Sequence, residues 1–303
     1  MPAPSNRRVA PRAPTPRIGP DDDAGGPAGA AGRRLSIRGS DAVWQVLELG
    51  SGGSTLLALP GGLGMVDGAG DALQAIAASR RVLALEYPPV RRMTALVDGI
   101  VELLDQLGLA TVDVLGSSYG AWVAQCLLRR HPTRVRCAVL AHGYALRAQD
   151  AKRLRIAAAV WRVLPPPLFR AMVTLRVRAV LAAARAASPA RYERVMLDVR
   201  AMLAAPDAAA PFIAQQHCMI ESLTAMPPDA GETVRPAHTV GIIESDDDPV
   251  IGARARERLR AAHPHAVVRR FRGTGHVTAL VAPAAFADAV AALTSTPRAS
   301  SGP

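Results

Sequence analysis

The chain has 303 residues, and half of them are apolar, which is enough for one large domain with a buried core. Its three cysteines are odd in number and lack paired spacing, which argues against a disulfide framework. The formal net charge is +11, almost all of it from arginine, but no nucleic-acid-binding motif accompanies this charge, so we expect no nucleic-acid partner.

The first segment, residues 1–40, is rich in Pro, Arg, Gly and Ala and has few large apolar side chains. Such a segment buries too little surface to offset its chain entropy, so we predict a disordered tail here and a shorter one over 295–303. No apolar stretch follows Arg7 and Arg8, as an export signal would require. No run approaches the roughly 20 apolar residues that span a bilayer, so we expect a cytoplasmic protein without a membrane span.

Short apolar runs alternate with helix-length segments over 41–144 and again over 236–294. Strands alternating with helices indicate βαβ units, and continuous apolar strands indicate a parallel sheet that is covered on both faces. The core is therefore predicted to be α/β. The strand-like runs are 54–60, 81–89, 111–117, 135–143, 237–245 and 266–273.

The alternation stops between 145 and 235, where helical segments follow one another without a buried strand. An interruption of roughly ninety residues is far longer than an ordinary connection, so we predict that a helical cap is inserted into the core. From Arg147 to Arg200 this insertion has twelve basic residues and three acids. The excess fits an anionic or carrier-linked substrate, and it equally fits a solvated helical face in an arginine-rich chain.

A Gly-Ser-Ser-Tyr-Gly sequence, residues 116–120, lies between a predicted strand and a predicted helix. It matches G-x-S-x-G, in which a strained turn exposes the central serine and leaves no space for side chains two positions away on either side. A helix that begins near Tyr119 directs free N–H groups at developing negative charge. Ser118 is therefore the candidate nucleophile, and Ser117, at an x position, is less suited.

A serine hydroxyl needs a base, and in this kind of fold the acid and then the histidine follow the serine along the chain. His276 follows the last predicted strand, where a loop can bring it to the carboxyl edge of the sheet. Asp246, Asp247 and Asp248 follow the preceding strand. We choose Asp248 as the acid because it begins an Asp-Pro-Val-Ile sequence, although Asp-Pro is also a helix start. His142 is predicted to be structural or part of a pocket wall.

The developing oxyanion requires two N–H donors. One is expected from Tyr119, directly after the serine. The other is expected from the glycine-rich loop 61–64, with Gly62 as first choice and Leu63 as second, because glycine allows the backbone to approach a substrate closely. The sequence has no metal-ligand cluster, and acyl transfer needs none, so we expect neither a metal nor another cofactor.

These motifs, with LALPGGLG, LALEYPP, VDVLGSSYGAW, IIESDDDPVI and GTGH in this order, resemble those of an α/β-hydrolase from about Val43 to Thr294. The combination of PGGLG, EYPP and GSSYG is similar to maspardin-like members. The resemblance implies an eight-stranded, mostly parallel sheet with helices on both faces and a cap over the active site. The oxyanion loop begins with Pro60-Gly61, where the wider family often has His-Gly.

The resemblance also implies a function. A serine nucleophile disfavours the dehalogenase and epoxide-hydrolase branches, which use aspartate. What remains is a serine hydrolase that cleaves an ester, thioester or lactone of a small molecule through an acyl-enzyme. Amidase and carbon–carbon bond hydrolase activities are further alternatives. A different class is a non-catalytic maspardin-like binding or adaptor protein on the same fold.

Overall fold

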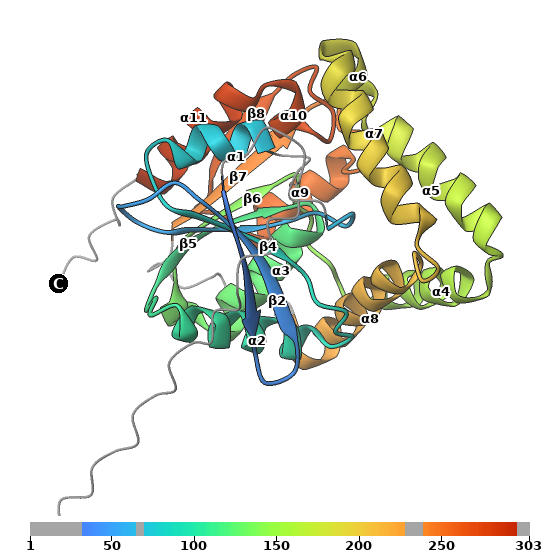
Figure 1. Ribbon diagram of the computed structural model, residues 1–303, viewed down its shortest axis with the longest axis horizontal. Helices are drawn as coiled ribbons and strands as arrows, with labels where there is room; N and C mark the ends of the chain where they lie inside the picture. Colours follow the sequence, from blue (N-terminus) through green and yellow to red (C-terminus); the bar gives the residue numbers. More distant parts are fainter. Residues whose placement is uncertain (1–31, 65–69, 228–238, 296–303) are drawn as a thin grey trace, which may run out of the picture.

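The computed structural model describes residues 32–64, 70–227 and 239–295 (Figure 1). In this part of the chain, eight strands form one sheet in the order β1-β2-β4-β3-β5-β6-β7-β8. Strand β2 is antiparallel to both of its neighbours, and all pairs from β4 to β8 are parallel. The strands are β1 (Arg33–Arg38), β2 (Val43–Leu49), β3 (Leu56–Leu59), β4 (Val82–Glu86), β5 (Val112–Ser117), β6 (Val135–Ala141), β7 (Thr239–Ser245) and β8 (Val267–Phe271).

Helices cover both faces of the sheet, which explains why its central strands are apolar throughout. All four residues of β3 are buried: Leu57 and Leu59 join one core cluster, and Leu56 and Ala58 join the other. Helices α1 and α11 pack on the second cluster, and α2, α3 and α9 on the first (Figure 1). These helices, with the short α10, are α1 (Gly70–Ala77), α2 (Met93–Gln106), α3 (Tyr119–Arg130), α9 (Ala253–Ala262), α10 (Thr278–Val281) and α11 (Pro283–Ser295).

Five helices lie between β6 and β7: α4 (Asp150–Val163), α5 (Pro166–Val180), α6 (Ala182–Ala187), α7 (Pro189–Ala204) and α8 (Ala210–Ala225). Helices α5, α6 and α7 stand away from the sheet (Figure 1). Residues of α5 and α7, and of the connections that follow these two helices, form a separate apolar core, which we name the cap cluster. Its buried members are Phe169, Val173, Val177, Leu181, Tyr192, Val195, Met196, Val199, Leu203 and Ala208.

Helix α8 packs closely on the sheet domain, because its residues Cys218, Met219 and Leu223 are buried in the first core cluster. The indole Nε1 of Trp122, on α3, donates a 2.9 Å hydrogen bond to the hydroxyl of Ser222. The carboxylate of Glu221 accepts the backbone N–H groups of Met93 and Thr94. Glu221 therefore caps α2, whose own N-cap residue provides no side-chain hydrogen bond.

The eight-stranded, mostly parallel sheet with helices on both faces is the predicted fold, and it is confirmed. The prediction of a disordered tail over 1–40 is wrong at its end, because residues 33–38 form β1. This edge strand buries only Leu35 and is held by backbone pairing to β2, so its apolar content gave no signal. The second predicted tail, 295–303, is wrong at its first residue, because Ser295 ends α11. Residues 1–31, 228–235 and 296–303, which carry most of the two tail predictions and the end of the predicted insertion, lie outside the described residues.

Among the described residues, no helix combines the length and apolar character required to cross a bilayer.

Candidate active site

Ser118 stands at the corner between β5 and α3 with φ of 51° and ψ of −111°. Positive φ is rare for residues with a side chain and marks local strain. The chain tolerates it here because the flanking glycines allow very close packing. A Cβ on Gly116 would collide with the carbonyl of Gly120, and a Cβ on Gly120 would collide with the carbonyl of Leu59. The steric reason for the G-x-S-x-G pattern is therefore present in the structure.

His276 lies in the loop between β8 and α10, at the carboxyl edge of the sheet. Its Nε2 is 3.0 Å from the Ser118 Oγ, and its Nδ1 is 2.8 Å from the Oδ2 of Asp248. The other oxygen of Asp248, Oδ1, accepts the backbone N–H groups of Val250 and Ile251, both at 2.8 Å. The structure therefore brings the three predicted residues together and fixes the carboxylate by bonds to both oxygens.

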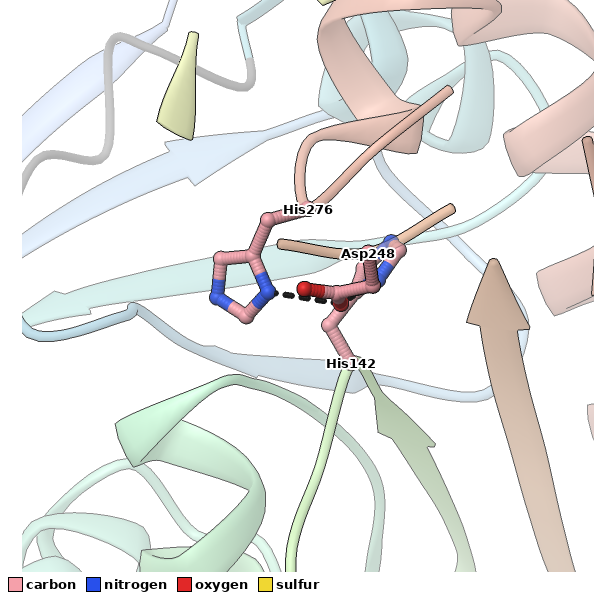
Figure 2. A group of neighbouring side chains, drawn as sticks. All are labelled: His142, Asp248 and His276. Atoms are coloured by element: carbon pink, nitrogen blue, oxygen red, sulfur yellow. Dashed lines mark hydrogen bonds and ion pairs between the residues drawn. The ribbon is translucent and has the colours of Figure 1, made fainter. Parts of the chain in front are cut away.

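A second histidine also binds Asp248. His142 directly follows β6, and its Nδ1 is 3.1 Å from the same Oδ2 that His276 contacts. Figure 2 shows the two imidazoles meeting at one carboxylate. The Nε2 of His142 is 2.9 Å from the hydroxyl of Thr278, and its backbone, like that of Ser118, has a positive φ. His142 is almost fully buried, so these contacts are its polar environment.

The protonation states follow from these contacts. Burial opposes ionisation of Asp248, but the hydrogen bonds from His142 and His276 outweigh it and hold the pKa of this carboxyl well below its usual range. Burial lowers the pKa of His142, although the hydrogen bond to Asp248 opposes the shift. At neutral pH we therefore assign an ionised Asp248 and a neutral His142 that donates its Nδ1–H to it and accepts from Thr278.

The two neighbouring acids do not contact His276. Asp247 accepts the hydroxyl of Ser245 at 2.6 Å and the backbone N–H of Gly275 at 3.2 Å. The first of these bonds lowers the pKa of Asp247, and the second ties the residue before His276 to the end of β7. Asp246 is half-exposed and pairs with Arg272. Of the three candidates for the acid, only Asp248 has the required geometry.

The loop 60–64 passes over the serine. A Cβ on Gly61 would lie 3.5 Å from the Cβ of Ser118. Two side chains hold this loop by its carbonyls: the Tyr87 hydroxyl donates to Pro60 at 3.1 Å, and the Gln215 amide donates to Gly62 at 2.9 Å. Tyr119 directly follows Ser118 and is the first residue of α3, and Gly62 follows the Gly61 that lies beside the serine. Their roles as oxyanion donors stay predictions.

Apolar side chains of the cap adjoin this region. Leu63, in the loop just described, and Val277, next to His276, both pack against the cap cluster. Three aromatic rings, those of Trp161, Phe169 and Phe212, contact one another in the same cluster with centroids 5.2–5.6 Å apart. The loop beside the serine and the residue after His276 are therefore joined to the cap by apolar contacts.

His142, Asp248 and His276 also form the one group in the described residues whose spacing would suit a metal ion, with ligand atoms within 4.8 Å of one another. Their nitrogens and oxygens are already engaged in hydrogen bonds to one another. The expectation that the protein uses no metal or other cofactor stays a prediction.

Sequence reasoning missed the contact of His142 with Asp248. A signal was available, because His142 follows a strand that lies between those carrying Ser118 and Asp248, and the carboxyl ends of parallel strands meet at one edge. A histidine at the carboxyl end of β6 therefore lies close to the loops that follow β5 and β7, which carry Ser118 and Asp248.

The family model for the alpha/beta hydrolase family matches residues 10–289. The chain belongs to this family, and the fold and the position of the serine agree with it. The finer resemblance to maspardin-like members stays a prediction.

Solved structures with the same fold include a hydrolase from Pseudomonas aeruginosa PA01, with 23% identity, a TM-score of 0.68, and coverage of 88% of this chain and 100% of that one. The enol-lactonase from Burkholderia xenovorans LB400 is 15% identical, with a TM-score of 0.68 and coverage of 86% and 100%. The meta-cleavage product hydrolase from Pseudomonas fluorescens IP01 is 18% identical, with a TM-score of 0.64 and coverage of 85% and 96%. A search of curated proteins gave no significant match. These neighbours show that the fold of this chain is that of known α/β-hydrolases.

Proposed function

We propose that the protein is a serine hydrolase that cleaves an ester, thioester or lactone through an acyl-enzyme. The observation that carries this proposal is the continuous chain of contacts from the Ser118 Oγ to His276 Nε2 and from His276 Nδ1 to Asp248. A hydroxyl in this position loses its proton to the imidazole as it attacks a carbonyl carbon. The ionised Asp248 holds the ring in the required tautomer and stabilises the imidazolium.

The first step forms the bond from the serine oxygen to the acyl carbon while His276 takes the hydroxyl proton. The backbone N–H groups of Tyr119 and Gly62 receive the developing oxyanion, and each such donor contributes about 3–4 kcal/mol in comparable sites. The tetrahedral intermediate expels the leaving group, which receives the proton from His276. Water, activated by the same imidazole, then cleaves the acyl-enzyme and restores the serine.

His142 acts in this scheme as a positioning residue. By donating to Asp248 Oδ2, it fixes the carboxylate from the side and favours its ionised form. It does not reach Ser118, so its effect on the reaction passes through Asp248 and His276.

The acyl group is expected to be apolar, because Leu63, in the loop beside the serine, and Val277, next to His276, are apolar and pack against the cap cluster. A panel of p-nitrophenyl esters of increasing chain length, with a thioester and a lactone, tests this expectation. Turnover should rise with chain length beyond acetate. Equal or falling turnover would contradict an apolar acyl site without affecting the assignment of the nucleophile.

The nucleophile is tested with Ser118→Ala and the matched variant Ser117→Ala, which changes the adjacent serine at the same corner. We expect Ser118→Ala to lower kcat on the best ester by roughly 10³-fold or more, as removal of a nucleophile does, and to abolish labelling by a fluorophosphonate probe. Ser117→Ala should keep the labelling.

The alternative function, a non-catalytic maspardin-like binding or adaptor protein, gives the opposite result. Folded wild-type protein would then not react with the probe, or it would react equally after Ser118→Ala. The short contacts among Ser118, His276 and Asp248 favour the enzyme, because a binding protein has no need to keep a base beside a strained serine.

A further inference from the structure

Helix α4 exposes a line of large apolar side chains to solvent. Ile156, Val160 and Val163 follow one another at intervals of four and three residues, which places them on one side of the helix. All three are exposed, Val163 to 75%. The opposite side, which carries Ala158, is buried, and the helix packs there against α8. The exposed apolar residues therefore lie on a different side of α4 from the residues that attach the helix to the rest of the protein.

Helix α5 repeats this arrangement. Leu168, Met172 and Leu175 have the same spacing and are exposed, Leu175 to 71%. Phe169, Val173 and Val177, which hold the helix in the cap cluster, lie on the buried side. A surface helix needs one apolar side, and α5 has two. Val163 and Leu168 stand close to the corner where α4 ends and α5 begins, at the outer edge of the molecule (Figure 1).

These two helices are also strongly basic. Asp150 is their one acid, and it is engaged by the backbone of Arg147 and by Arg258. At about 100° per residue, Arg176 and Arg178 lie on either side of the exposed line on α5. The exposed basic residues of the two helices are Lys152, Arg153, Arg155, Arg162, Arg170, Arg176 and Arg178.

We propose that the outer sides of α4 and α5 bind the surface of an anionic lipid bilayer. The apolar lines enter the boundary between headgroups and acyl chains, and the arginines beside them contact lipid phosphates. An acidic protein would satisfy the arginines but would leave a row of apolar side chains to be covered. An anionic bilayer provides both the negative charge and the apolar medium, and each basic residue near such a surface contributes about 1 kcal/mol.

The experiment measures co-sedimentation of the full chain with two kinds of vesicle, one of phosphatidylcholine alone and one of phosphatidylcholine mixed with phosphatidylglycerol. We expect partitioning to be at least roughly ten-fold stronger on the anionic vesicles and to fall with added salt. Ser118→Ala should partition as the wild type does, so this proposal and the proposed hydrolase can fail separately.

Two pairs of variants locate the binding surface. Leu175→Gln should weaken partitioning several-fold, whereas Leu197→Gln, on α7 and 59% exposed, should not. Arg176→Gln combined with Arg178→Gln should weaken it further, whereas Arg254→Gln combined with Arg269→Gln removes the same charge from α9 and β8 and should have little effect. All these side chains are exposed, so the variants should fold, and circular dichroism checks that they do.

Several results would overturn the proposal. Equal partitioning on both kinds of vesicle would show that the arginines do not recognise lipid charge. If the control variants lost as much partitioning as the α5 variants do, the binding would not be located on the outer sides of α4 and α5. If Leu175→Gln instead changed only the sedimentation velocity of the free protein, the exposed lines would be a contact between two copies. Binding to poly-L-glutamate but not to anionic vesicles would indicate an acidic macromolecule.

Discussion

The carboxyl edge of the sheet and the outer cap, helices α5 to α7, are held together by different forces. At the sheet edge, each polar atom of Asp248 and His142 has a directional partner, and two residues have strained backbones. The outer cap is held mainly by its own apolar core, and Arg191 of α7 pairs with Asp71 of α1. Directional bonds fix reacting atoms within fractions of an ångström, whereas apolar packing tolerates movement and exchange of side chains. We therefore expect the two regions to respond differently to perturbation.

The largest effect is expected at the corner that carries Ser118. Gly120→Ala places a methyl group against the backbone carbonyls of Leu59, at the end of the buried strand β3, and of Pro60, directly after it. We expect the free energy of unfolding to fall by more than about 4 kcal/mol or folded protein to be lost, as measured by urea denaturation. Gly252→Ala, where a Cβ would meet nothing within 4 Å, is the control and should stay within about 0.5 kcal/mol of the wild type. A Gly120→Ala variant of normal stability would contradict the rigidity ascribed to this edge.

A second experiment asks whether the cap unfolds by itself. Leu203→Ala, in the cap cluster, should remove about 2–5 kcal/mol from the packing of α5 to α7. Hydrogen exchange should then become faster in these helices and stay unchanged in β5 to β7, because the cap has its own core. The matched variant Leu293→Ala, on α11 in the sheet domain, should accelerate exchange throughout the molecule. Acceleration of the sheet by Leu203→Ala would mean that the two regions form one cooperative unit.

The role of His142 is tested next. His142→Ala removes a hydrogen bond to a charged group, which is worth about 1.5–3 kcal/mol, so we expect kcat/KM to fall by roughly 10- to 100-fold with the fold retained. Without the N–H of His142, the negative charge of Asp248 is shared with His276 alone and stabilises the protonated imidazole of His276 more strongly. The acid limb of the kcat/KM profile should therefore move to higher pH. His131→Ala removes a histidine from another aspartate, Asp98, and should change neither quantity. A uniform loss across the pH range would indicate a merely structural role.

The smallest effect concerns stability in acid. Burial lowers the pKa of His263 to about 4, below the value near 6.5 of the unfolded chain. As the pH falls below 6.5, the unfolded chain binds a proton at His263, whereas the folded protein does not bind it until the pH approaches 4. The free energy of unfolding therefore falls over this pH range. Between pH 7 and pH 5.5 this loss is about 1 kcal/mol, and His263→Gln should remove it from urea titrations at the two pH values. His265→Gln, at an exposed position two residues away, should keep the wild-type difference.

Much of the sheet edge could be predicted from the sequence because its geometry is imposed by local sterics. The Gly-x-Ser-x-Gly sequence after an apolar strand specifies a tight strand-to-helix turn with an exposed serine. The parallel arrangement of the strands then brings the loops after β7 and β8 to the same edge of the sheet. The choice of Asp248 over Asp246 and Asp247 depended on its local sequence, and the contact with His276 agrees with that choice.

Other features could not be predicted because they depend on contacts between distant segments. The strand β1 is held by backbone pairing to β2 and has almost no apolar pattern of its own. The insertion divides into an outer cap and a docked α8 because Cys218, Met219 and Leu223 of α8 join the first core cluster of the sheet domain. Glu221 and Ser222 add polar bonds to α2 and α3, and nothing in the local pattern distinguishes these two residues from surface residues. The bond between His142 and Asp248 joins positions 106 residues apart in the chain.

Helix α8 connects the loop 60–64, which lies beside the serine, to helices α2 and α3 of the sheet domain. Near one end, Gln215 holds the Gly62 carbonyl, and about two turns further on, Glu221 and Ser222 bind α2 and α3. A rigid-body swing that carried this helix away would break all of these bonds and pull the loop off the serine. An opening of α5 to α7 that spares them must bend the chain at both ends of this segment, in the connection 205–209 and in the turn between α4 and α5. Such a movement would admit substrate and release product while Gln215, Glu221 and Ser222 keep their bonds.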